Sequence, residues 1–177
     1  MDGGRIVMDK ALLVIDMVND FAAPNGAVYV RSTADVINPI IEKIKAVKAS
    51  GYAVYFVSDA HEENDREFRA WPKHCIKGTK GAEVIEDLDT TDSTIIGKTT
   101  FSGFFETILD GDLKRKRIKE LILVGCMTNV SILHTAADAV LRGYKVTVPR
   151  DCVTGLDKVD EEAALKHMGH ILNVDII

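Results

Sequence analysis

The sequence predicts an α/β fold, a three-layer sandwich in which a central, about six-stranded parallel sheet lies between layers of helices. Short β-branched apolar runs alternate along the chain with segments whose apolar residues repeat every three or four positions, a pattern typical of βαβ units. The 177 residues are 46% hydrophobic and 28% charged, which is enough chain for a substantial core. We therefore expect one domain spanning residues 1–177.

The individual elements follow from the period of the apolar residues. Strands are expected at residues 11–15, 53–57, 94–96, 120–124, 145–148 and 174–177. Helices are expected at residues 37–47, with a stop at Gly51, around residues 104–109, at residues 130–142, closed by Gly143, and at residues 158–168. The polar stretch between the second and third strands predicts a long functional loop.

Composition and charge narrow the class of protein. A net charge of −5 argues against binding to nucleic acid or to an anionic membrane. No run reaches the roughly 18 apolar residues that cross a bilayer, and the first residues lack the apolar core of a signal peptide. The three cysteines are widely spaced and indicate no disulfide framework, as in a reducing compartment. We expect a soluble, cytoplasmic protein.

Polar residues stand where four predicted strands end. They are Asp16, Asp59, Lys98 and the turn that leads to Ser131. A single carboxylate at such a place is often a helix cap, and a single lysine is usually a surface residue. Ligands of open α/β sheets, however, bind beyond the carboxyl ends of the strands, so the convergence favours a site. The turn before Ser131 directs backbone N–H groups and a helix N-terminus at one point, which stabilises a thiolate or an oxyanion.

A second group of residues has the composition of a metal site. Side chains alternate along a strand, so Asp59 and His61 project on one face, and His74 offers a third donor from the loop. Oxygen and imidazole donors of this kind suit zinc, iron(II) or manganese. The alternative is that both histidines are partly exposed loop residues.

Four segments, taken in order, resemble the isochorismatase-like cysteine hydrolases, and most closely their nicotinamidase/pyrazinamidase branch. They are residues 11–21, residues 59–83, residues 98–104 and residues 125–139. The resemblance covers most of the chain. It implies the isochorismatase-like hydrolase fold, an assembly that in relatives is often a homo-oligomer, and an activity in NAD salvage: hydrolysis of the amide of nicotinamide to nicotinate and ammonia.

The resemblance also implies roles for particular residues. Asp16, Lys98 and the residue at position 131, which is cysteine in the hydrolytic members, would form a catalytic triad with Asp16 as base and Lys98 as its partner. The backbone N–H groups of Met127 and residue 131 would form the oxyanion hole, set by a cis peptide bond between Cys126 and Met127.

For the metal, the resemblance implies a divalent ion, zinc before iron or manganese, held by Asp59, His61 and His74 and bound to the pyridine nitrogen of the substrate. Asp65 and Glu67 are both candidates for a fourth contact. Phe21, Trp71 and Phe101 would enclose a flat aromatic amide, although aromatic residues are more often core than site.

Two positions depart from the family pattern: Asn129 stands where aspartate is common, and Ser131 stands at the nucleophile. A serine hydroxyl has a far higher pKa than a thiol, and the triad offers no histidine base, so we predict little or no amide hydrolysis. Cys126 is a poor substitute because it lies five residues earlier, across the turn.

Three explanations of Ser131 stay open. The serine replaces a natural cysteine by design, or the chain is a natural member with different chemistry, or it is a non-catalytic protein that binds a small molecule. The different chemistry would be hydrolysis of another small amide or of a vinyl ether, as in the isochorismatases. The candidate metal residues argue against the vinyl-ether branch, which needs no metal tuned to a pyridine nitrogen.

Overall fold

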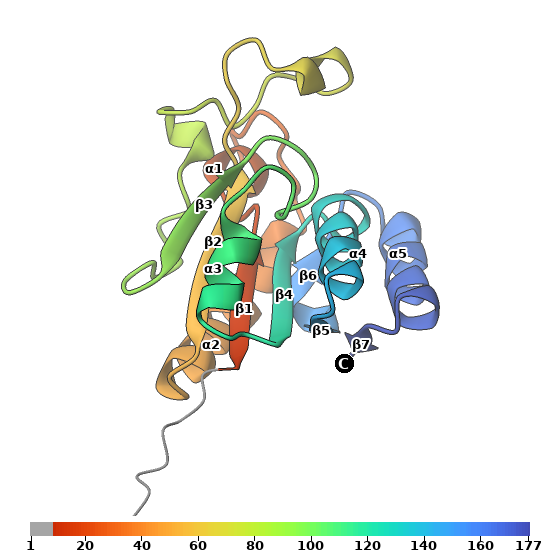
Figure 1. The fold of residues 1–177 in the computed structure, drawn as a ribbon. Helices are drawn as coiled ribbons and strands as arrows, with labels where there is room; N and C mark the ends of the chain where they lie inside the picture. The colour runs from red at the N-terminus through yellow and green to blue at the C-terminus, as the bar shows by residue number, and fades with distance from the viewer. Residues whose placement is uncertain (1–8) are drawn as a thin grey trace, which may run out of the picture.

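The structure, a computed structural model, describes residues 9–177 (Figure 1). Its strands are β1 (Lys10–Ile15), β2 (Ala53–Asp59), β3 (Thr94–Lys98), β4 (Glu120–Cys126), β5 (Lys145–Val148), β6 (Val153–Thr154) and β7 (Asp175–Ile176). They form one sheet in the order β3-β2-β1-β4-β5-β7, with β6 beside β4, and all the observed pairings are parallel. The predicted parallel sheet is confirmed, and β6 is a two-residue strand that the apolar pattern did not predict.

Helices cover both faces of the sheet, as the fold class requires (Figure 1). On one face lie α1 (Asn19–Ala22) and α2 (Thr33–Ala49), whose apolar side chains pack with those of the strands in one core cluster. On the other face lie α3 (Leu109–Arg115), α4 (Leu133–Leu141) and α5 (Lys158–Ile171), which pack in a second cluster. Within residues 9–177 no helix combines the length and hydrophobicity that a membrane crossing requires.

The helix expected around residues 104–109 is wrong, because these residues form turns and α3 begins only at Leu109. Glu106 has a φ of 52°, in the left-handed region, which interrupts a right-handed helix at this point. The Gly103 N–H donates to the Thr135 hydroxyl at 3.0 Å, and the Phe104 N–H donates to the Ser102 hydroxyl at 3.2 Å. The turn therefore places Phe104 in the core without a helix.

Gly125 allows β1 and β4 to approach closely just before the candidate site. It pairs with Ile15 across the two strands and has a φ of 115°. A Cβ atom at this position would lie 2.0 Å from the Ile15 carbonyl oxygen. Glycine is therefore required here. The close approach brings Asp16, the residue after Ile15, beside the turn that follows β4.

Candidate active site

Asp16, Lys98 and Ser131 come together at the carboxyl edge of the sheet. Asp16 follows β1 with a φ of 51°, Lys98 ends β3, and Ser131 lies in a single π-helical turn, Thr128–Ile132, between β4 and α4. The Lys98 Nζ lies 2.9 Å from the Asp16 Oδ2 and donates to the Ser131 Oγ at 3.4 Å. Lys98 is only 1% exposed, so it is not a surface lysine.

Lys98 also pairs with Asp59, a contact that the sequence did not predict. The backbone N–H of Asp59 in turn donates to the Asp16 Oδ1 at 2.8 Å. One buried ammonium group therefore lies between two buried carboxylates, and it connects the triad positions to the candidate metal residues.

The charges of these three groups depend on one another. Burial, with the nearby charge of Asp59, raises the pKa of Asp16 to about 6 despite the opposing charge of Lys98. Burial also opposes ionisation of Asp59, but the charge of Lys98 and the nearby rings of His61 and His74 outweigh it and hold the pKa of Asp59 below its usual range. Burial lowers the pKa of Lys98, yet the two carboxylates outweigh this and raise it. Asp16 is therefore the member poised to exchange a proton near neutral pH.

The candidate metal residues form a compact cluster beside the triad. Asp59, His61, Glu67 and His74 each offer a ligand atom, and these four atoms all lie within 4.8 Å of one another. Glu67 is thus the loop carboxylate that joins the three predicted metal residues. The carboxylate of Asp65 instead lies 3.1 Å from the outer ring nitrogen of His61, Nδ1.

The partners of the two outer histidine nitrogens favour tautomers in which this cluster fits a cation. The Nδ1 of His74 lies 2.7 Å from the Pro72 carbonyl oxygen, which can only accept a hydrogen bond, and the Nδ1 of His61 faces the Asp65 carboxylate. In the neutral rings both Nε2 lone pairs then face the Asp59 carboxylate, at 3.6 Å and 3.4 Å. The buried Nε2 of His61 has no hydrogen-bond partner among residues 9–177. A divalent metal ion would satisfy both lone pairs and the carboxylate.

The turn before Ser131 has the expected backbone. The Cys126–Met127 peptide bond is cis, as the resemblance implied. The N–H groups of Val130 and Ile132 both donate to the Met127 carbonyl oxygen, which forms the π-helical turn. The thiol of Cys126 donates to the Asp16 carbonyl oxygen at 3.3 Å, and its burial raises its pKa well above the usual value. Cys126 is therefore an inert buried thiol.

The predicted aromatic residues line the same small pocket as the polar groups. The pocket is lined by Phe21, Asp59, Glu67, Trp71, His74, Phe101, Met127, Val130 and Ser131. Its cavity volume is about 10 Å³, roughly the space of one water molecule. This volume is too small for an aromatic ring, so lining side chains must move before an aromatic amide can enter. Val130 is a lining residue that the sequence analysis did not single out.

The other histidines and cysteines lie outside this site. His134 is exposed, with its ring 5.2 Å from that of Phe101, and His167 and His170 are exposed on α5. Cys75 and Cys152 are buried free thiols, as expected of packing residues.

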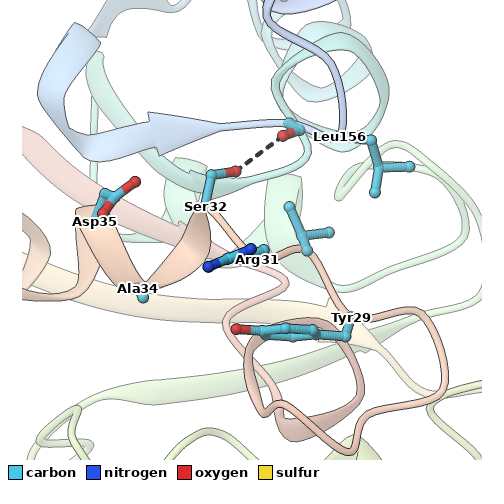
Figure 2. Close-up of a pocket in the computed structure, with 8 residues that line it drawn as sticks. Tyr29, Arg31, Ser32, Ala34, Asp35 and Leu156 are labelled. Atoms are coloured by element: carbon cyan, nitrogen blue, oxygen red, sulfur yellow. Dashed lines mark hydrogen bonds between the residues drawn. The ribbon is translucent and has the colours of Figure 1, made fainter.

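Another pocket, at the start of α2, holds none of the predicted site residues (Figure 2). The Ser32 hydroxyl there donates to the Gly155 carbonyl oxygen at 3.0 Å and accepts from the Thr154 hydroxyl at 2.7 Å. The Ser32 hydroxyl is thus satisfied within the protein, and the pocket shares no lining residue with the site described above.

Comparison with known proteins shows the family to which the chain belongs. The isochorismatase domain matches residues 10–175. The chain belongs to the isochorismatase family. A relative with a solved structure, the Pyrococcus horikoshii pyrazinamidase in complex with zinc, is 35% identical and superposes with a TM-score of 0.90 over 96% of this chain and 98% of the other. Bacillus subtilis nicotinamidase PncA is 31% identical, with a TM-score of 0.89 over 96% and 99%.

A third relative of this isochorismatase-family chain comes from a plant. It is an Arabidopsis thaliana protein named as a probable inactive nicotinamidase, 33% identical over 155 residues, which are 81% of this chain and 79% of the other. Together the relatives support an amidohydrolase of the isochorismatase superfamily.

Proposed function

We propose that this chain has the site of a nicotinamidase: it binds a flat aromatic amide with its ring nitrogen at a divalent metal, zinc before iron or manganese, and its carboxamide at residue 131. The observation that supports this most is that the triad positions and the metal cluster are in direct contact. Lys98 contacts Asp16 and Ser131 of the triad positions and Asp59 of the metal cluster. A generic amidohydrolase would not need the cluster.

Each residue has a role that its position supports. Asp59, His61, Glu67 and His74 would hold the metal, and Asp65 would fix the ring of His61. When bound, the ion would supply a Lewis-acid contact that orients the substrate's ring nitrogen. Phe21, Trp71 and Phe101 would enclose the ring, which leaves the carboxamide at the turn that carries Ser131.

With cysteine at position 131, the groups present would complete amide hydrolysis. Asp16 takes the thiol proton, and Lys98 stabilises the resulting thiolate. The sulfur bonds to the carbonyl carbon while the N–H groups of Met127 and residue 131 stabilise the oxyanion. The C–N bond then breaks, Asp16 returns the proton to the departing ammonia, and water hydrolyses the thioester to the acid.

With serine the first step fails. The hydroxyl holds its proton far more tightly than a thiol does, and a carboxylate whose pKa is about 6 is a weak base for it. We therefore infer that the chain with Ser131 binds the amide and turns it over poorly or not at all. This favours a second candidate, a small-molecule-binding protein without turnover, and the name of the Arabidopsis relative agrees with it.

Metal content and a matched pair of ligands test the substrate class. We expect one divalent ion per purified chain by elemental analysis. In the cobalt-substituted protein, nicotinamide should change the visible absorption of the metal, while benzamide, which has the same shape without the ring nitrogen, should not. If no stoichiometric ion is found, or if benzamide acts like nicotinamide, another small amide becomes the better substrate.

A further inference from the structure

Asp20, which lies in α1, joins this short helix to the loop that follows His74. Its Oδ2 atom accepts from the backbone N–H of Cys75 at 2.6 Å, and its Oδ1 atom accepts from the backbone N–H of Ala27 at 3.1 Å. Gly81 lies so close that a Cβ atom there would overlap the Asp20 carboxylate. Hydrogen bonds to a charged acceptor are stronger than those between neutral groups, so Asp20 fixes the start of this loop.

Cys75 connects Asp20 to both histidines of the metal cluster. It directly follows His74 in the chain, and its carbonyl oxygen accepts from the backbone N–H of His61 at 2.9 Å. The next residue, Ile76, pairs with His61 in a parallel bridge. The backbone at Cys75 therefore determines where the two histidines lie relative to each other, and the bond to Asp20 holds that backbone in place.

The conformation of Cys75 requires such an anchor. Its φ is 47°, in the left-handed region that residues other than glycine seldom adopt. A backbone in this region is retained only where the surrounding contacts determine it. Here both polar backbone groups are bound, the N–H to Asp20 and the carbonyl oxygen to His61. Loss of the Asp20 carboxylate should let Cys75 relax and carry His74 away from the cluster.

We propose that Asp20 is a positioning residue for the metal site. By holding the Cys75 N–H, it places the Nε2 atoms of His61 and His74 beside the Asp59 carboxylate, where they lie at 3.6 Å and 3.4 Å from it. Asp20 is not one of the four residues of the cluster, so it acts through the backbone. This role rests on the proposed function, because that function identifies the cluster as a metal site.

The Asp20→Ala variant of the full chain tests this role with and without metal. We expect zinc affinity in a chelator competition titration to fall about 10- to 100-fold. In the cobalt-substituted variant the visible absorption should change, because a displaced histidine alters the coordination of the ion. In the metal-free variant the ring proton signals of His61 and His74 should move in NMR spectra, while those of the exposed His134 on α4 should not.

Gly81→Ala and Gly78→Ala form a matched pair that leaves Asp20 unchanged. The methyl group added at Gly81 pushes against the Asp20 carboxylate, so zinc affinity should fall about tenfold. Gly78 lies in the same loop with a φ of 77° and nothing within 4 Å of the added atom. Gly78→Ala therefore strains the loop without touching Asp20, and zinc affinity should be unchanged.

The outcomes separate this role from the proposed function. Unchanged zinc affinity and cobalt absorption in Asp20→Ala, or equal losses of affinity in Gly81→Ala and Gly78→Ala, would overturn the positioning role. An unsubstituted chain that binds no zinc would contradict the proposed function instead. The metal-free spectra then decide: displaced ring signals of His61 and His74 in Asp20→Ala support the placement by Asp20, and unmoved signals overturn it.

Discussion

Lys98 is the residue on which the candidate site depends most. Removing an ammonium group from water costs several kcal/mol, and this one is repaid by two carboxylates, Asp16 and Asp59. In the same arrangement the pKa of Asp16 is raised and the pKa of Asp59 is lowered. Because Lys98 is buried, it belongs to no surface network of ion pairs. Its role lies in the chemistry proposed for residue 131.

Replacement of Lys98 by methionine should destabilise the protein strongly, because it leaves two buried carboxylates without a counter-charge. We expect the free energy of unfolding in urea to fall by about 3–5 kcal/mol. The matched control is Lys77→Met, which removes an exposed lysine paired with Glu62 at 2.6 Å and should cost less than about 1 kcal/mol. Similar losses in the two variants would contradict the account.

Asp65 should control metal affinity without being a ligand. Its carboxylate holds the Nδ1 of His61 and so directs the Nε2 of that ring at the cluster. We expect Asp65→Ala to weaken zinc binding about 10- to 100-fold in a chelator competition titration. Glu63→Ala, which removes an exposed carboxylate paired with Lys73, is the control and should leave the affinity unchanged. An equal effect of both changes would mean that Asp65 does not orient His61.

At the level of elements, the strands other than β6 were predictable, and parts of the connections were not. Buried β-branched runs mark β1, β2, β4 and β5 to within two residues, because strands of a parallel sheet are apolar on both faces. The choice between Asp65 and Glu67 was not predictable. It depends on a 3₁₀ turn, Arg66–Arg69, which the Asp65 side chain caps by accepting from the Glu67 N–H at 3.0 Å, and which turns Glu67 inward.

The contact between β1 and β4 should tolerate no side chain at Gly125. Gly125→Ala adds both backbone strain and a clash with Ile15, so we expect a loss of about 3 kcal/mol or more in the free energy of unfolding. Gly51→Ala has a similar positive φ, 74°, but nothing within 4 Å of the added atom, and should cost about 1 kcal/mol. A mild Gly125→Ala variant would show that the strands can separate at this point.

The loop that carries Glu67 and Trp71 should behave as a mobile cover. Its 3₁₀ turn contains no buried residue, while the pocket beneath it is too small for an aromatic ring. We expect amides of residues 62–71 to exchange with deuterium faster than those of β2, and to slow when zinc and nicotinamide are added together. If the amides of residues 62–71 already exchange slowly without ligand, and the ligand nevertheless binds, the substrate enters by another route.

At the level of the whole molecule, the parallel sheet explains why distant segments form one site. The carboxyl ends of β1, β2, β3 and β4 lie at the same edge, and they deliver Asp16, Asp59, Lys98 and the turn with Ser131. The sequence predicted this convergence because strand ends could be located from the apolar runs. It could not predict that Lys98 would contact Asp59 as well as Asp16, since that depends on the register of β2 and β3, which pairs Asp59 with Lys98.

Ammonia release from nicotinamide is the most direct measurement of the central claim, that this fold holds a nicotinamidase site with serine in place of the nucleophile. We would assay the chain, its Ser131→Cys variant and the Ser131→Cys/Asp16→Asn variant with the same divalent metal. The account predicts turnover by Ser131→Cys alone, more than about a thousandfold above the other two. Equal activity of the serine and cysteine forms, or a metal-loaded Ser131→Cys variant that releases no ammonia, would contradict it.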